Sequence, residues 1–274
     1  MNHVLSDVQA QPDTRGIALG EVGIDGLRYP LLVADGQGGK REVAATVTMS
    51  VSLGADIKGA HLSRFIEVLQ EWRDQLGPDS ALSMVDDLRG RMGSTNARVK
   101  IAFPYFLERQ APVTGIPSFM DYACELDISA DDAKAVLLQQ VCVPVTSVCP
   151  CSKAISDRGA HNQRGWVTIG VRARDPRGDL WFDDLITVAE LSGSSPVYSL
   201  LKRPDERHVT MAAYDNPVFV EDMARNVVTV LRRDNRIAEY RVRVLNDESI
   251  HNHAAYAEFP WTTTDEIGGR PDAG

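Results

Sequence analysis

Two cysteines and a histidine near the middle of the chain form its densest group of potential metal ligands. Cys149 and Cys151 flank Pro150, and His161 follows ten residues after Cys151. A strand that ends in a folded-back loop could bring thiolate and imidazole to one ion, since zinc and neighbouring transition metals favour sulfur and nitrogen ligands. Because only two or three ligands are supplied here, a closed structural site is incomplete and room remains for a bound water. We therefore interpret this segment as the active site.

Three other places carry polar residues that an apolar core does not require. A run of charge at residues 200–210 contains Glu206, which could supply a hard third ligand. Glu221 falls a few residues inside an expected helix, where a carboxylate also favours the helix dipole. His251 and His253 lie between two predicted strands, and alternation would put both imidazoles on one face. Either imidazole could then act as an acid, a base or a ligand.

Composition describes an ordinary globular chain. With 274 residues, 43% of them apolar and 24% charged, it can build one large domain or two smaller ones. It has no apolar run near the roughly 18 residues of a membrane span, and its first residues lack the order of a signal peptide. We expect a cytoplasmic protein that has no membrane partner. Its four cysteines are too few and too clustered for a disulfide framework.

Charge is unevenly distributed along the sequence. The net charge of −9 argues against a general nucleic-acid binder, which needs a basic face to replace counterions. Cations nevertheless gather in and after the candidate site: Lys153, Arg158, Arg164, Lys202, Arg203 and Arg207. They are either solvated surface charge or the means of attracting a small polyanion.

Hydrophobic periodicity predicts an α+β fold. Apolar residues at three- and four-residue spacing predict helices, and β-branched alternating runs predict strands. The first half then contains strands at 27–34 and 42–53 around a turn at 35–39, helices at 61–72 and 80–92, and strands at 99–106 and 118–127. The second half contains strands at 133–145 and 166–174, helices at 181–191 and 216–232, and strands at 238–245 and 254–260. Asn216 is expected to cap the last helix, with Pro217 at its first position.

Two similar halves follow from this element order. Residues 27–129 read β-β-α-α-β-β, and residues 130–261 repeat the order approximately, carrying the candidate site. Residues 1–26 are mostly polar and rich in glycine, so we expect a flexible arm. The acidic, glycine-containing tail at 262–274 is expected to be disordered.

Four separated motifs resemble those of type IB GTP cyclohydrolases, and they occur in the same order. They are residues 58–65, 146–164, 216–223 and 249–253. This family makes 7,8-dihydroneopterin triphosphate and formate from GTP, which opens folate synthesis. Its members have the tunnelling fold (T-fold), in which β-β-α-α-β-β units join their antiparallel sheets into barrels. The resemblance thus implies two tandem T-fold units per chain and a homotetramer.

The resemblance also implies roles for individual residues. Cys149, His161 and Glu206 match the metal-binding positions, with Asp205 as a neighbouring competitor for the third. Cys151 and His251 match catalytic groups beside the metal, and Glu221 matches the guanine anchor. Cations that could bind the triphosphate, some of them reaching in from a neighbouring subunit, are Lys58, His61, Arg64, Lys202 and Arg203.

The chemistry of the reaction is consistent with these residue types. A divalent ion, whether Zn, Mn or Fe(II), lowers the pKa of bound water from about 16 toward 7, which supplies the nucleophile that must add at C8 of the purine. A thiol or imidazole beside it can move protons as the ring opens. The Glu221 carboxylate can accept from N1–H and the amino group of guanine together, whereas adenine offers no such pair.

Four other interpretations remain open. The cysteines could be small core residues, or part of a structural zinc module, although the spacing lacks the paired pattern of zinc fingers. Cys151 with His161 or His251 could form a thiol nucleophile, as in a T-fold relative that acts on a deazaguanine nitrile. The chain could also be a purine or pterin binder without catalysis.

Overall fold

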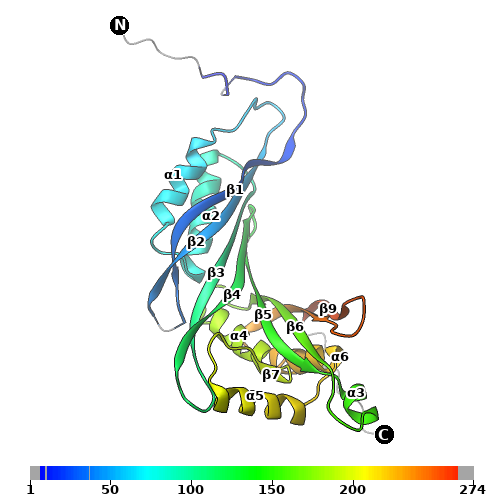
Figure 1. The fold of residues 1–274 in the computed structure, drawn as a ribbon. Coiled ribbons are helices and arrows are strands. Elements are labelled where there is room, and N and C mark those ends of the chain that lie inside the picture. The colour runs from blue at the N-terminus through cyan, green and yellow to red at the C-terminus, as the bar shows by residue number, and fades with distance from the viewer. Residues whose placement is uncertain (1–6, 10, 37, 265–274) are drawn as a thin grey trace. The chain divides into compact units, whose positions relative to one another are not determined.

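A computed structural model describes residues 7–9, 11–36 and 38–264. Its chain divides into two compact units (Figure 1). The first comprises Met1–Phe103 with Glu125–Leu138, and the second comprises Pro104–Cys124 with Gln139–Gly274. The strands pair in the order β1-β2-β3-β4-β5-β6-β8-β9, with the two-residue β7 beside β5. No described helix is long and apolar enough to cross a membrane.

The first unit follows the predicted order of elements. Its elements are β1 (Leu19–Ala34), β2 (Lys40–Leu53), α1 (Ser63–Trp72), α2 (Pro78–Met92), the first part of β3 (Ala97–Gln110), the last part of β4 (Pro117–Ala130) and the first residues of β5 (Ala135–Val148). The predicted hairpin turn is confirmed, since the Asp35 N–H donates to the Gly39 carbonyl at 2.9 Å. Helix α2 starts at Pro78 and stops at Gly93, which has a φ of 61°. The helix ends where predicted, at the glycine, and starts two residues before the predicted residue 80, with the proline in its first turn.

Alternation builds the core of this unit. Every second residue of β2 from Val43 to Val51 is buried, as the two-residue period of a strand requires. Helix α1 buries Phe65, Val68 and Leu69, whose spacing forms a single stripe. The core of the first unit is thus apolar side chains at periodic positions.

Strand β1 begins earlier than the sequence suggested. Residues 19–26 are strand, although we expected the flexible arm to extend to residue 26. Two glycines of this stretch serve the strand. A side chain at Gly23 would meet the Met49 carbonyl oxygen at 1.8 Å, and Gly26 has a φ of 66° where the β1–β2 register shifts. The expected arm therefore shortens to the residues before Leu19.

The second unit carries the longer series of elements. They are the last part of β3, the first part of β4, most of β5, α3 (Pro150–Ile155), β6 (Asn162–Ala173), α4 (Phe182–Glu190), β7 (Ser195–Pro196), α5 (Arg203–Asp215), α6 (Val220–Leu231), β8 (Ile237–Asp247) and β9 (Ala255–Thr263). Strands β5, β6, β8 and β9 are antiparallel neighbours, and α6 packs on β8 and β9. This fold matches the antiparallel sheet with helices on one face that the sequence predicted.

Three local predictions in this unit were wrong. The charged run after residue 202 is helix α5 rather than a connection between helices. Asn216 ends α5, and α6 begins only at Val220, with Phe219 at its N-cap. The segment after Cys149 is a short helix instead of an irregular loop. Of the tail that we expected to be disordered, residues 262 and 263 belong to β9, and residues 265–274 lie outside the described part of the chain.

Candidate functional site

Cys149 and His161 lie opposite each other in the backbone at the loop end of the β5–β6 hairpin. The last paired residues of the two strands are Val148 and Asn162. One step further, the Cys149 N–H donates to the His161 carbonyl at 3.1 Å. The predicted approach of these two residues therefore comes from strand pairing, which fixes cross-strand neighbours.

A short helix holds this end of the hairpin in place. Cys149 is the N-cap of α3, and its Sγ accepts from the Ser152 N–H at 3.4 Å. Pro150 occupies the first position of α3, where a missing N–H costs nothing. The Ser152 hydroxyl oxygen in turn accepts from the His161 N–H at 3.2 Å. The Cys149 thiol and the backbone of His161 are therefore both held by Ser152.

A cavity of about 300 Å³ opens beside this pair. Four segments of the second unit contribute to it: the end of β5 with α3, the start of β6, the start of α6, and the connection from β8 to β9. The lining residues are Ser147, Cys149, Cys151, His161, Gln163, Val218, Phe219, Val220, Glu221, Asn246, Glu248, His251, His253 and Ala255. Thiols, imidazoles and carboxylates thus line the same cavity.

Three imidazoles cluster at the cavity. The rings of His161 and His251 lie edge to face, with centroids 6.4 Å apart. His251 and His253 stack at 5.2 Å, and His251 Nδ1 is 3.4 Å from a carboxylate oxygen of Glu248. The two histidines come together through a bend, not through alternation along a strand as we expected, because β8 ends at Asp247 and β9 starts at Ala255.

Of the carboxylates predicted for the site, only Glu221 lies in the cavity wall. It occupies the first turn of α6. The linker before α6 is anchored to β5, since the Val218 N–H donates to the Val148 carbonyl at 3.1 Å. Glu206 is exposed on α5 and does not line the cavity. The sequence analysis missed Glu248, which does.

Asp205, the competitor for the third ligand position, is wholly buried and already satisfied. Its Oδ1 accepts from the backbone N–H groups of Val113 and Thr114 at 2.9 and 2.8 Å. Its Oδ2 accepts from the Thr114 hydroxyl at 2.7 Å and the Lys202 N–H at 3.0 Å. Burial acts to raise its pKa, but these hydrogen bonds outweigh burial and hold the pKa well below its ordinary value. Asp205 therefore fastens the β3–β4 loop to α5 and has no free oxygen for an ion.

The predicted cations fall in two places. Lys202 and Arg203 are exposed at the start of α5, in the same unit as the cavity. Lys58, His61 and Arg64 belong to the first unit, where they contact Gln11, Asp7 and the Arg91 carbonyl respectively. None of the five lines the cavity.

The donor set at the cavity suits a divalent transition metal. Cys149 and His161 offer sulfur and nitrogen, and Glu221 and Glu248 offer oxygen. Within residues 7–9, 11–36 and 38–264, no three such side chains are yet close enough together to hold one ion. The types of donor that line the cavity therefore fit a metal ion.

The four cysteines differ in environment. Cys151 is exposed, Cys149 and Cys142 are half-buried, and Cys124 is buried; all four are free. Burial, with a smaller contribution from the charge of Asp183, raises the pKa of the Cys124 thiol well above its ordinary value. Only the two thiols at the cavity are placed for chemistry.

Three lining residues that the sequence analysis did not consider are buried polar side chains. Ser147, Gln163 and Asn246 are 0%, 8% and 2% exposed. Each continues an inward-facing apolar series of its strand, so a polar residue at an inward position was the available indication. Their hydrogen bonds meet at the Ser147 hydroxyl.

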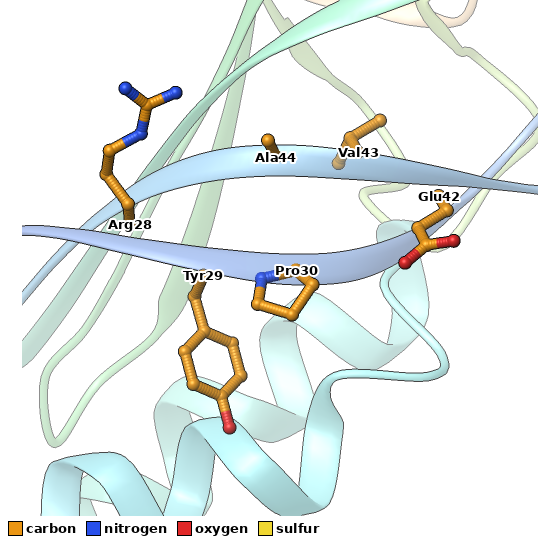
Figure 2. Close-up of a pocket in the computed structure, with 6 residues that line it drawn as sticks. All are labelled: Arg28, Tyr29, Pro30, Glu42, Val43 and Ala44. Atoms are coloured by element: carbon orange, nitrogen blue, oxygen red, sulfur yellow. The ribbon is translucent and has the colours of Figure 1, made fainter.

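A larger surface hollow of about 450 Å³ lies in the first unit, on the β1–β2 hairpin. Its six lining residues are Arg28, Tyr29, Pro30, Glu42, Val43 and Ala44. Figure 2 shows Arg28 and Tyr29 projecting to opposite sides of the strand. The hollow contains no thiol and no imidazole, so its size does not make it the better candidate.

Comparison with known proteins gives one consistent result. A family model described as type I GTP cyclohydrolase FolE2 matches residues 5–257. The GTP cyclohydrolase FolE2 of Pseudothermotoga lettingae is 46% identical over 253 residues, covering 92% of this chain and 97% of that protein. That of Methylococcus capsulatus is 47% identical over 253 residues, covering 92% and 93%.

Solved structures support the fold alone. The uricase of Arthrobacter globiformis superimposes with a TM-score of 0.52 at 10% identity, covering 93% of this chain and 97% of that one. Urate oxidase from Bacillus sp. TB-90 gives 0.52 at 9% identity, covering 89% and 100%. The likeness extends over most of each chain, in agreement with the T-fold architecture expected from the sequence.

Proposed function

The chain belongs to the type I GTP cyclohydrolase FolE2 family, and from this premise we propose that it converts GTP and water to 7,8-dihydroneopterin triphosphate and formate. That reaction is the first step of folate biosynthesis. The observation that carries the proposal is the single cavity lined by Cys149, Cys151, His161, Glu221 and His251. These are the groups that a purine ring opening needs for nucleophile activation, proton transfer and base recognition.

Cys149 and His161 are proposed to hold a divalent ion, since the family depends on a metal. When bound, such an ion supplies Lewis-acid activation of water for addition to the purine. We propose a carboxylate as the third donor: Glu206, as the family resemblance implies, or Glu248, which already lines the cavity. Comparing Zn²⁺ affinity in Glu206→Gln and Glu248→Gln distinguishes the two, because only the variant that loses a ligand binds more weakly.

Glu221 is proposed to select guanine. Its carboxylate lies in the first turn of α6, at a helix end that favours negative charge. Two parallel N–H donors of guanine, N1–H and the amino group, match the two oxygens of one carboxylate. Adenine would leave the carboxylate without this pair of donors, which is the arrangement that discriminates most strongly.

Cys151 and His251 are proposed to move protons. The exposed Cys151 thiol and the His251 ring both line the cavity. Glu248 lies beside His251 Nδ1, which leaves Nε2 as the nitrogen available to substrate. Each such group contributes typically about 10²- to 10⁴-fold to a rate. They serve the ring nitrogens during opening and the sugar carbons during rearrangement.

The triphosphate needs cations, and we propose Lys202 and Arg203 from the start of α5. Lys58, His61 and Arg64 would add to them from a neighbouring subunit of a homotetramer. Sedimentation of the purified protein tests the tetramer directly. The four free cysteines favour a reducing compartment, and we propose that the enzyme works in the cytoplasm.

The test is incubation of the purified protein with GTP and Zn²⁺, Mn²⁺ or Fe²⁺. We expect release of formate and, after oxidation, the fluorescence of a pterin. GTP binding without either product would favour a purine binder instead. A thioimide formed on a deazapurine nitrile, with GTP unchanged, would favour a thiol nucleophile at Cys151.

Removal of the metal separates catalysis from structure. A chelator is expected to abolish turnover while the circular dichroism of the protein stays unchanged, and added metal is expected to restore turnover. Unfolding on chelation would instead indicate a structural site, since the binding free energy of a structural ion is folding free energy.

A further inference from the structure

A buried chain of polar side chains runs beneath the cavity through three neighbouring strands. Ser147 on β5 pairs in register with Gln163 on β6, and Asn246 on β8 pairs with Gly165 of β6. A buried polar group without a partner destabilises the fold, so the hydrogen bonds that such groups make constrain their orientation. Here the bonds have a direction that can be followed from one end.

The direction is set by a backbone carbonyl. Ser147 Oγ lies 3.1 Å from the Val218 carbonyl oxygen. A carbonyl only accepts, so the hydroxyl must donate to it, and Ser147 Oγ is left to accept. Gln163 Nε2 at 3.2 Å and Asn246 Nδ2 at 3.1 Å both donate to that oxygen. The amide of Gln163 therefore turns its NH₂ group to Ser147 and its carbonyl oxygen away.

That carbonyl oxygen reaches the candidate metal ligand. Gln163 Oε1 lies 2.9 Å from His161 Nδ1. An amide oxygen accepts, so His161 Nδ1 must carry the hydrogen, and a neutral imidazole with a hydrogen on Nδ1 keeps its lone pair on Nε2. The hydrogen on Nδ1 follows from these contacts whether or not a metal is bound.

We infer that Gln163 and Ser147 are positioning residues that fix the tautomer of His161, through a hydrogen-bond chain from the Val218 carbonyl to Nδ1. This hydrogen-bond chain leaves the lone pair on Nε2, at the cavity that Cys149 also lines. Partners of this kind orient a ligand before the ion arrives, and losing them weakens metal binding by about 10- to 100-fold. The use of the lone pair for a metal rests on the proposed function, whereas the tautomer does not.

Asn246 provides a matched control. It donates to the same Ser147 oxygen, but neither this hydrogen bond nor its strand neighbour Gly165 connects it to His161. Removing its side chain leaves every link between Val218 and His161 in place. Removing Gln163 breaks the last link, and removing the Ser147 hydroxyl frees the amide of Gln163 to turn over.

The experiment is nitrogen-15 NMR of the imidazoles in the metal-free, full-length protein, at a pH where they are neutral. The His161 signals are assigned by their loss in His161→Asn. We expect His161 to carry its hydrogen on Nδ1 in wild type and in Asn246→Ala, and to become a mixture of tautomers in Gln163→Leu and Ser147→Ala. Zn²⁺ affinity, measured by competition with a chelator, should fall about 10- to 100-fold in Gln163→Leu and remain near wild type in Asn246→Ala.

A predominant Nε2–H tautomer in the wild type would overturn the inference, and so would an unchanged tautomer in both Gln163→Leu and Ser147→Ala. Two variants are used so that a folding defect in one leaves the question answerable with the other. The proposed function fails separately. Wild type with the Nδ1–H tautomer but no turnover of GTP would sink the function alone, whereas turnover with the opposite tautomer would sink the inference alone.

Discussion

The two units of the chain bury different kinds of side chain, although both stack helices on antiparallel strands. Among the described residues, the first unit buries one uncharged polar side chain, Ser50, and no charged one. The second unit buries eight polar or charged side chains: Gln139, Ser147, Gln163, Ser192, Ser194, Ser195, Asp205 and Asn246. The difference lies in what the cores contain, since the elements around them are alike.

An apolar core stabilises such a fold with fewer requirements on its side chains than a polar one. Burying apolar area stabilises without any demand on geometry, whereas each buried polar group must find its partners. Three of the eight polar residues, Ser147, Gln163 and Asn246, lie directly beneath the cavity. The second unit therefore buries polar side chains where residues of the site have to be oriented, and the first unit does not.

The contrast between the two units bears on function only if turnover depends on the cavity of the second unit. Cys149→Ala is expected to abolish turnover of GTP, because it removes the sulfur donor from the cavity that His161 also lines. The control is Cys124→Ala, since Cys124 is buried with a raised pKa and does not line the cavity. Formate release measures both. Wild-type turnover by Cys149→Ala, or loss of turnover by both variants, would contradict the assignment.

A crossed pair of variants sharpens the comparison. Leu69→Ala in the first unit removes a fully buried side chain of α1 and should lower the free energy of unfolding by about 2–5 kcal/mol. Its Zn²⁺ affinity should stay near wild type. Gln163→Leu replaces the amide with an apolar side chain of similar size and should lose less stability than Leu69→Ala while losing metal affinity. Urea unfolding and chelator competition give the two readouts, and equal stability losses would remove the contrast.

Gly90 of α2 and Gly93 at the C-terminal cap of this helix test how backbone conformation affects the stability of the first unit. Gly93 has a φ of 61°, whereas Gly90 lies within the helix, and a methyl group at either would meet nothing within 4 Å. Gly93→Ala should destabilise by about 1 kcal/mol, and Gly90→Ala should stabilise by about 0.5–1 kcal/mol. Shifts of the same sign in thermal unfolding would refute the conformational explanation.

The smallest effect concerns acid stability in the second unit. The pKa of Asp205 is lowered by its hydrogen bonds from an ordinary 3.8, so the unfolded chain binds a proton more readily than the folded one. Its contribution to stability is complete above the ordinary pKa and is lost as the pH falls through the lowered one. The difference in free energy of unfolding between wild type and Asp205→Asn should therefore shrink as the pH drops below about 4. A difference that stays constant would show that the charge of Asp205 contributes nothing.

Much of the fold could be predicted because its elements follow a period. The stripe of Phe65 and Leu69 identified α1, and the alternation of β2 identified a strand. Helix α5 could not be found in this way, since only Asp205 and Ala213 of its 13 residues are buried and no apolar stripe exists. Asn216 was misassigned because an asparagine before a proline is equally at home after one helix and before the next.

The site was predictable only where residue type alone carried the chemistry. Cys149 and His161 were found because thiols and imidazoles are rare and they lie close in sequence. Gln163 and Ser147 were missed because an amide or a hydroxyl on a strand is ordinary unless its inward position is known. Burial and hydrogen-bond direction, which single out these two residues, exist only in the folded chain.

Cys149 and His161 are proposed to bind one metal ion together, and Co²⁺ titration of the metal-free protein probes this proposal without relying on catalysis. A thiolate bound to cobalt gives an intense charge-transfer absorption in the near ultraviolet. We predict this band in the wild type at one equivalent, its loss in Cys149→Ser, and weaker Co²⁺ binding with the band retained in His161→Asn. Absence of the band in the wild type, or its persistence in Cys149→Ser, would contradict the assignment of Cys149.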